Sequence, residues 1–137
     1  MNEAGVIRGM LDGKTIAVVG LSADPMKPSH YVSAYMQAQG YRILPVNPAL
    51  AASEALVLGE RVYGSLQELP LKPDVVDVFR PADAIPAIVD EMLALGLKNL
   101  WVQQGIWNVA AAVRAEQGGI RVVMDRCIMV EHRNRRA

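Results

Sequence analysis

The sequence predicts one doubly wound α/β domain built on a parallel sheet. Short apolar runs rich in β-branched residues alternate with stretches of helical length, which is the pattern of strands joined by crossover helices. The chain has 137 residues, a common size for one domain, and 52% of them are hydrophobic, enough to fill a core. We therefore expect a single domain over residues 1–137.

The predicted strands are short apolar runs bounded by turn residues. The run from Ile16 to Val19 contains no alternating polar positions, which indicates burial on both faces, and Gly20 ends it. Asn47 and Pro48 end the second strand in the same way. The strands are expected at 15–20, 41–46, 74–79, 99–103 and 120–124.

The predicted helices follow from apolar spacing and from residues that begin or end a helix. Ser29 is expected to cap the second helix, and Gly40 ends it. Pro86 falls in the first turn of the third helix, where its missing N–H does little harm, and Gly96 ends that helix. The helices are expected at 6–11, 29–39, 84–95 and 108–117, with a single turn at 66–69 and a last short element at 125–133.

These elements predict a Rossmann-like sandwich with a five-stranded parallel sheet. Right-handed crossovers place the helices on both faces of the sheet. Counted along the chain, the strand order is expected to be 3-2-1-4-5. In such a sheet, ligands bind beyond the carboxyl ends of the strands, at the point where the order reverses.

The charge balance argues against a nucleic-acid-binding protein. The 14 Lys and Arg residues equal the 14 Asp and Glu residues, whereas phosphate neutralisation needs a basic surplus. Residues 121–137 hold five basic and two acidic residues, a local excess of three, and we expect 131–137 to form a solvated basic tail. No apolar run approaches the ~20 residues that span a bilayer, so no membrane association is expected. Residues 1–15 also lack the apolar region of a signal peptide.

Cys127 is the one cysteine of the chain, so no internal disulfide can form. This cysteine usage fits a reducing compartment, and we expect a cytoplasmic protein. His30 and His132 have no metal-ligand spacing with carboxylates or with Cys127, so no metal site is expected.

The first strand–helix loop, residues 20–29, is the expected anion site. Free backbone N–H groups and the helix dipole at a helix N-terminus favour a phosphate. Gly20 allows a close backbone approach, Ser22 offers a hydroxyl and Lys27 adds positive charge. The alternative is an ordinary turn that carries an exposed lysine.

The nucleotide motifs narrow the ligand class. The dinucleotide fingerprint G-x-G-x-x-G is absent, because Ser22 and Pro25 occupy the second and third glycine positions. Asn47 stands where an acidic residue would hold a ribose diol. The pattern G-x-x-x-x-G-K-[ST] is also missing, which argues against ATP hydrolysis. The residues by themselves indicate a phosphate-bearing ligand that is not a dinucleotide.

A set of ordered segments covers nearly the whole chain and carries a family resemblance. The segments are Val19-Gly20-Leu21-Ser22 with Pro25-x-Lys27-Pro28-Ser29, Gly40-Tyr41 with Pro45-Val46-Asn47-Pro48, Leu58-Gly59-x-x-Val62-Tyr63-x-Ser65-Leu66, Val75–Arg80, Trp101–Ile106 and Val122–Cys127. Together they resemble the small stand-alone CoA-binding proteins, whose domain is similar to the N-terminal domain of the succinyl-CoA synthetase alpha subunit.

The resemblance implies that the ligand is coenzyme A or an acyl-CoA. The family more often has Arg at the place of Lys27; Lys keeps the charge but loses the bidentate fork. The 3′-phosphate of CoA needs a cation, for which Arg42, Arg80 and Lys27 are the candidates. The implied contacts are Gly20, Leu21, Ser22, Ala23 and Lys27 for the phosphates, Asn47 and Pro48 for adenosine, Phe79, Arg80 and Pro81 as pocket lining, and Val102, Gln103 and Gln104 beside the pantetheine or the diphosphate.

The leading functional hypothesis is a non-catalytic CoA-binding carrier, sensor or partner module. The alternatives are a small acyl-CoA-processing enzyme, an NAD(P)-binding redox sensor and a structural subunit. No catalytic residue is assigned, because Gln103, Gln104 and Cys127 do not supply a general base. Cys127 follows a strand end on the ligand side; we expect a buried structural cysteine, with a mixed disulfide to the CoA thiol as the alternative. A protein partner or a homo-oligomer stays open.

Overall fold

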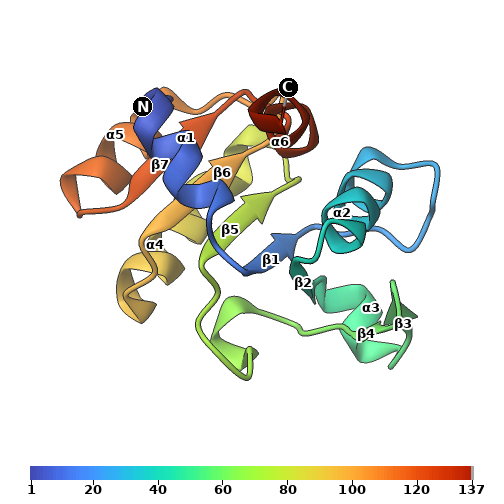
Figure 1. The fold of residues 1–137 in the computed structure, drawn as a ribbon. Helices are drawn as coiled ribbons and strands as arrows, with labels where there is room; N and C mark the ends of the chain where they lie inside the picture. The colour runs from blue at the N-terminus through green and yellow to red at the C-terminus, as the bar shows by residue number, and fades with distance from the viewer. Residues whose placement is uncertain (137) are drawn as a thin grey trace.

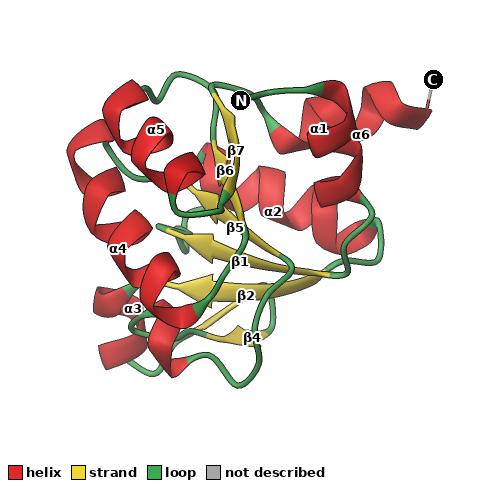
Figure 2. Cartoon of the chain, turned by 90° about the vertical axis from the view of Figure 1, so that its left-hand side faces the viewer, coloured by secondary structure: helices red, strands yellow, loops and turns green. Residues whose placement is uncertain are grey.

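A five-stranded parallel sheet forms the middle layer of the computed structural model, which describes residues 1–136 (Figures 1 and 2). Each strand is a run of β-branched and other apolar residues, and nearly all of these are buried. The expected fold class is therefore confirmed. The strands are β1 (Thr15–Val19), β2 (Arg42–Val46), β5 (Val75–Val78), β6 (Asn99–Val102) and β7 (Arg121–Met124).

Helices cover both faces of this sheet (Figure 2). On one face, α4 (Ile85–Leu95) and α5 (Val109–Gln117) pack against side chains such as Ala17 and Val76. On the other face, α1 (Ala4–Leu11), α2 (Pro28–Ala38) and α6 (Ile128–Arg136) pack against side chains such as Val18 and Trp101. Alternate residues of a strand point to opposite faces, so one strand contributes to both core clusters. None of the described helices is long and apolar enough to cross a bilayer.

The segment between β2 and β5 contains small elements. They are α3 (Pro48–Ala52), an antiparallel pair formed by β3 (Leu56–Val57) and β4 (Glu60–Arg61), and the 3₁₀ turn η1 (Leu66–Glu68); a second 3₁₀ turn, η2 (Ala82–Ala84), precedes α4. The predicted single turn at 66–69 is confirmed.

The expected strand order is wrong. The observed order is β2-β1-β5-β6-β7, which is 2-1-3-4-5 when the sheet strands are counted along the chain. Val18 of β1 pairs with Pro45 of β2 on one side and with Asp77 of β5 on the other. The order therefore reverses between β1 and β5, and the loops that follow these two strands flank the crevice.

Pro45 is the sequence signal for this order. The N–H of Tyr63 donates to the carbonyl oxygen of Pro45 at 2.9 Å, on the side of β2 that faces away from β1. Proline lacks the N–H that a full neighbouring strand would use there, so it favours an edge strand. The short Tyr63 bridge covers this edge, where the expected order would have put a complete strand.

One expectation about a helix end is also wrong. Ser29 does not cap α2, which begins at Pro28; its hydroxyl instead accepts a hydrogen bond from the N–H of Ser22 at 2.9 Å. The expected basic tail is helical up to Arg136 as the end of α6, with Arg133 and Arg135 exposed, His132 buried and Arg135 paired with Asp12. The last residue of that expected tail, Ala137, lies outside the described residues.

Candidate ligand-binding site

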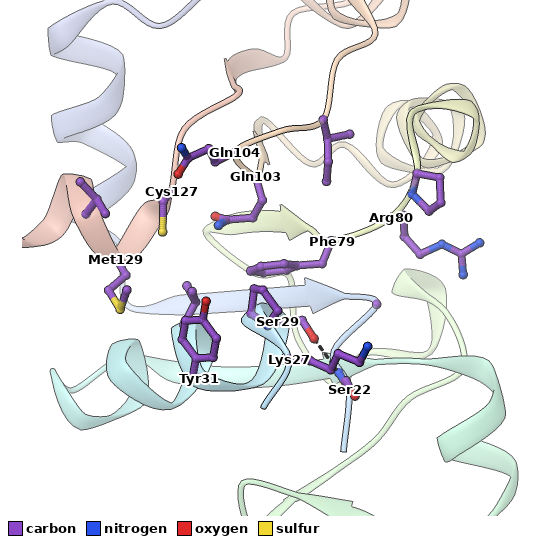
Figure 3. A pocket seen from close by; sticks show the side chains of 16 residues that line it. Ser22, Lys27, Ser29, Tyr31, Phe79, Arg80, Gln103, Gln104, Cys127 and Met129 are labelled. Atoms are coloured by element: carbon purple, nitrogen blue, oxygen red, sulfur yellow. Dashed lines mark hydrogen bonds between the residues drawn. The ribbon is translucent and has the colours of Figure 1, made fainter. Parts of the chain in front are cut away.

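A cavity of about 690 Å³ lies at the carboxyl edge of the sheet, where the strand order reverses (Figure 3). Its walls come from the loop after β1, the first turns of α2, the residues after β5 and β6, and the start of α6. The lining residues are Gly20, Ser22, Lys27, Pro28, Ser29, Tyr31, Val32, Phe79, Arg80, Pro81, Gln103, Gln104, Ile106, Cys127, Met129 and Val130.

Gly20 brings the ends of β1 and β5 together. Its φ of +88° lies in the region that glycine adopts readily, and a Cβ atom at this position would lie 2.6 Å from the carbonyl oxygen of Phe79. The N–H of Gly20 donates to the carbonyl of Val46, and the N–H of Phe79 donates to Val19, both at 2.9 Å. These contacts fix the floor of the cavity.

The loop between β1 and α2 is ordered by its own hydrogen bonds. The hydroxyl of Ser22 accepts from the N–H of Asp24 at 3.0 Å, and the carboxylate of Asp24 accepts from the N–H of Met26 at 2.9 Å. With the Ser22–Ser29 bond, these contacts hold the loop against the first turn of α2. The positive end of the α2 dipole therefore faces the cavity from a fixed position.

One end of the cavity is cationic. Lys27 and Arg80 are both exposed and lie at the same end, together with Ser22 (Figure 3). They are the charged side chains among the described lining residues. Two cations and a helix N-terminus together make this end suited to a phosphate-bearing ligand.

Gln103 connects the floor of the cavity to α6. Its side chain is buried, and its Oε1 accepts from the N–H of Ile128 at 3.1 Å, which ties down the first turn of α6. The backbone N–H of Gln103 donates to Val78 at 3.2 Å. Because the Oε1 of Gln103 is used in this bond, its side-chain amide nitrogen is the group that can donate a hydrogen bond at the cavity wall. Cys127, just before α6, is half-buried rather than fully buried as expected, and its side chain lines the cavity.

Residues 14–133 match the family described as CoA binding domain. This chain belongs to the CoA-binding domain family. It is 43% identical to YneT of Bacillus subtilis (strain 168), a protein named as uncharacterised, over 87% of this chain and 85% of YneT. A solved structure from Thermus thermophilus superposes with a TM-score of 0.89 at 41% identity and covers 98% of both chains.

A larger relative contains the same domain as one part of its chain. The alpha subunit of an ADP-forming acetate–CoA ligase from Pyrococcus furiosus (strain ATCC 43587 / DSM 3638 / JCM 8422 / Vc1) is 29% identical over 67% of this chain. The match spans 20% of the ligase subunit, so this CoA-binding domain corresponds to about a fifth of that protein.

The structure gathers most of the site residues predicted for this CoA-binding domain around one cavity. Tyr31 and Met129 were not predicted, because they lie within α2 and α6 and the rule of strand carboxyl ends selects loops only. The predicted residues that line the cavity are Gly20, Ser22, Lys27, Phe79, Arg80, Pro81, Gln103, Gln104 and Cys127. Pro28 and Ser29 belong to the expected anion loop 20–29, and Ile106 belongs to one of the segments that carry the resemblance, although none of the three was named as a contact. The lining residues missed by the sequence are Tyr31, Val32, Met129 and Val130.

The remaining predicted residues lie elsewhere. Leu21 and Val102 are fully buried in the two core clusters, and Ala23 and Pro48 are exposed without lining the cavity. Asn47 has a structural position: its Oδ1 accepts from the N–H of Leu50 at 3.2 Å at the start of α3, and its Nδ2 donates to Leu21 at 3.1 Å. Arg42, expected as a candidate for the 3′-phosphate, begins β2 and so lies at the opposite edge of the sheet.

Asp77 is a buried carboxyl beneath the cavity floor. Asp77 lies on β5, two residues before Phe79, and its side chain is on the same face of the sheet as that of Phe79. Asp77 is 1% exposed. Its Oδ1 has no hydrogen-bond partner among the described residues, and its strand neighbours at the same level are Val18 and Trp101. Burial raises the pKa of this carboxyl well above its ordinary value, because the charged form loses its hydration.

Proposed function

We propose that this CoA-binding domain binds coenzyme A, or a thioester of it, as a binding module without chemistry of its own. The observation that carries the proposal is the cationic end of a cavity at the switch point of the sheet, in a chain of this family. Ligands of doubly wound folds bind at this point, and phosphates bind at helix N-termini.

The phosphates of the ligand would lie at the cationic end. The first turn of α2 and the side chain of Lys27 are suited to the diphosphate, and Gly20 also lines the cavity. Lys27 and Arg80 are the described cations that line the cavity, so they are the candidates for the 3′-phosphate now that Arg42 lies at the far edge. A phosphate between two exposed cations gains charge-assisted hydrogen bonds.

The pantetheine would pass Gln103 and Gln104 toward Cys127. The buried amide of Gln103 offers a donor to the amide carbonyls of pantetheine, and Phe79 offers an apolar surface beside it. The other groups at this end are the Cys127 thiol, the Tyr31 hydroxyl and apolar side chains, and the described lining holds no His or carboxylate, which are the commonest general bases. These groups support a carrier, sensor or partner module over a hydrolase, and the single cysteine supports a cytoplasmic location.

Isothermal titration of the ligand-stripped protein tests the proposal. CoA is expected to bind with a micromolar Kd, about −8 kcal/mol, and dephospho-CoA more weakly if the 3′-phosphate is contacted. NAD is expected not to bind. NAD binding without CoA binding would overturn the proposal in favour of the dinucleotide alternative.

Lys27→Gln is the matched variant for the same titration. It removes one cation from the lining and is expected to weaken CoA binding by about tenfold. Lys98→Gln is the control, because Lys98 is exposed but does not line the cavity. Equal affinities of the two variants would place the phosphates elsewhere.

A further inference from the structure

We infer that the end of the cavity between α2 and α6 holds the acyl group of a thioester ligand, and that this acyl group is apolar and uncharged. The inference rests on the proposed function, because the acyl group follows from CoA phosphates at the cationic end. It adds a second subsite and a substrate class to that function.

The lining changes in character from one end of the cavity to the other. Figure 3 shows Lys27, Arg80 and Ser22 at one end, with Tyr31 and Met129 at the other. Val32 and Val130 belong to the same helices as these two residues and also line the cavity. The described residues that line the α2–α6 end carry no charge, so this end is suited to a hydrocarbon group.

Gln103 lies between the two ends, and Cys127 lies beside Met129 where the α2–α6 end begins (Figure 3). A thiol and an amide donor can contact a thioester, whose sulfur and carbonyl oxygen are weakly polar. A ligand that has its phosphates at Lys27 and its thioester near Cys127 would direct its acyl carbons toward Met129. The order of chemical groups along the cavity thus matches the order of groups in an acyl-CoA.

The walls of the α2–α6 end are fixed before any ligand arrives. The hydroxyl of Tyr35 on α2 and Nδ1 of His132 on α6 are hydrogen-bonded at 2.9 Å, and their rings meet edge to face. Ile128 is buried, and Gln103 holds its N–H. A preformed site avoids the cost of ordering its walls on binding.

The apolar surface at this end is left open to solvent. Tyr31 is 47% exposed and Val130 is 40% exposed, although both belong to helices whose other faces are in the core. An acyl chain would cover these side chains and remove apolar surface from water. Met129 is half-buried, and the flexible methionine side chain adapts to chains of different length.

A carboxylate at the end of the acyl group would not gain a partner within this lining. Arg133 lies behind Met129, where one guanidinium nitrogen is 3.5 Å from the Met129 sulfur and the guanidinium carbon is 5.3 Å from the centre of the Tyr35 ring. It is not part of the cavity wall. Dehydrating a carboxylate without a partner is unfavourable, so a neutral acyl group is preferred over a dicarboxylic one.

Titration of the full chain with CoA and with acetyl-, butyryl-, hexanoyl- and succinyl-CoA tests the inference. From acetyl- to butyryl-CoA, we expect the Kd to fall by up to about fourfold per methylene, the fold-change that corresponds to ~0.8 kcal/mol of burial. Succinyl-CoA is expected to bind about tenfold more weakly than butyryl-CoA.

Three results would count against the inference, each in its own way. Equal Kd values for CoA and the neutral acyl-CoAs would overturn it while the proposed function stands. Tighter binding of succinyl-CoA than of butyryl-CoA would overturn the uncharged class. A failure to bind CoA at all would overturn the proposed function and the inference together.

Val130→Asp places a carboxylate in the apolar wall. We expect butyryl-CoA to bind about tenfold more weakly to this variant, with the Kd of CoA changed less than about twofold. Val113→Asp is the matched control, because Val113 on α5 is 44% exposed but does not line the cavity. Val130→Ala keeps the helix apolar and should reduce only the gain per methylene. An equal loss of CoA and butyryl-CoA binding in Val130→Asp would assign this wall to pantetheine instead.

Discussion

Gly20 and Phe79 meet so closely that a Cβ atom on Gly20 would lie 2.6 Å from the Phe79 carbonyl oxygen. This contact joins the ends of β1 and β5, the two strands between which the order reverses. The floor of the cavity therefore depends on a residue with no side chain.

Gly20→Ala should destabilise the fold and weaken CoA binding. Alanine would have to adopt a φ of +88° and displace the backbone of β5, a combined cost of about 2–4 kcal/mol in the free energy of unfolding. Urea unfolding measures the loss. Gly40→Ala is the control, because Gly40 has a φ of +99° but no atom within 4 Å of the added Cβ. A Gly20→Ala variant no less stable than Gly40→Ala would contradict the close approach.

Asp77→Asn should stabilise the protein at neutral pH. Burial raises the pKa of Asp77 in the folded state above its unfolded value, so between the two values the folded state binds more protons. The Asp77 contribution therefore makes stability fall as pH rises from about 4 toward the raised pKa. Asn removes the charge at similar volume, and we expect a gain of roughly 1–3 kcal/mol at pH 7 in urea unfolding.

Asp74→Asn is the control of opposite sign for this pH profile. The carboxylate of Asp74 accepts from the N–H groups of Lys14 and Thr15 at 2.7 and 3.1 Å, and these bonds lower its pKa. The Asp74 carboxylate therefore stabilises the folded state above about pH 4, and this stabilisation is lost as the pH falls through the lowered pKa of Asp74. Its removal should reduce stability at pH 7. If Asp77→Asn leaves the pH dependence of the free energy of unfolding unchanged, Asp77 does not destabilise the folded state as expected.

Gln103→Met should loosen the start of α6. The variant keeps the side-chain length but leaves the N–H of Ile128 without its acceptor, at a cost of about 1–2 kcal/mol. Amide hydrogen exchange at Ile128 should become faster, and CoA should bind more weakly because α6 forms one wall of the cavity. Gln104→Met, at an exposed lining position, should leave the exchange rate unchanged. Unchanged protection at Ile128 in Gln103→Met would refute the capping role.

CoA affinity should depend on salt through Lys27 and Arg80. Both cations are exposed, so added salt screens their attraction for phosphates. We expect the Kd of CoA to rise several-fold between about 0.05 and 0.5 M NaCl. Arg80→Gln should weaken binding by about tenfold at low salt and flatten this dependence, whereas Arg8→Gln, on α1 and away from the cavity, should not. A wild-type Kd independent of salt would argue against phosphate contacts at this end.

The sequence alone predicted the layered fold and the loops of the site. Strands of four or five residues are short enough for composition and turn residues to define, and their carboxyl ends share one edge of a parallel sheet. That rule selected Gly20, Lys27, Arg80 and Gln103, all of which line the cavity. Local chemistry was sufficient for these residues because the chain direction alone sets which edge they occupy.

The tertiary structure decided which strands are neighbours and which helix faces converge. The alternation of strands and helices is the same for either strand order. Pro45 indicated that β2 is an edge strand, but the alternation pattern by itself does not use this signal. Asn47 does not line the cavity, because its side chain caps α3. Tyr31 and Met129 line the cavity because α2 and α6 pack side by side. The position of α2 beside α6 depends on contacts between segments about 100 residues apart, such as Tyr35 with His132, and no local propensity encodes such contacts. The Asn47 cap is instead a local contact with Leu50, three residues along the chain.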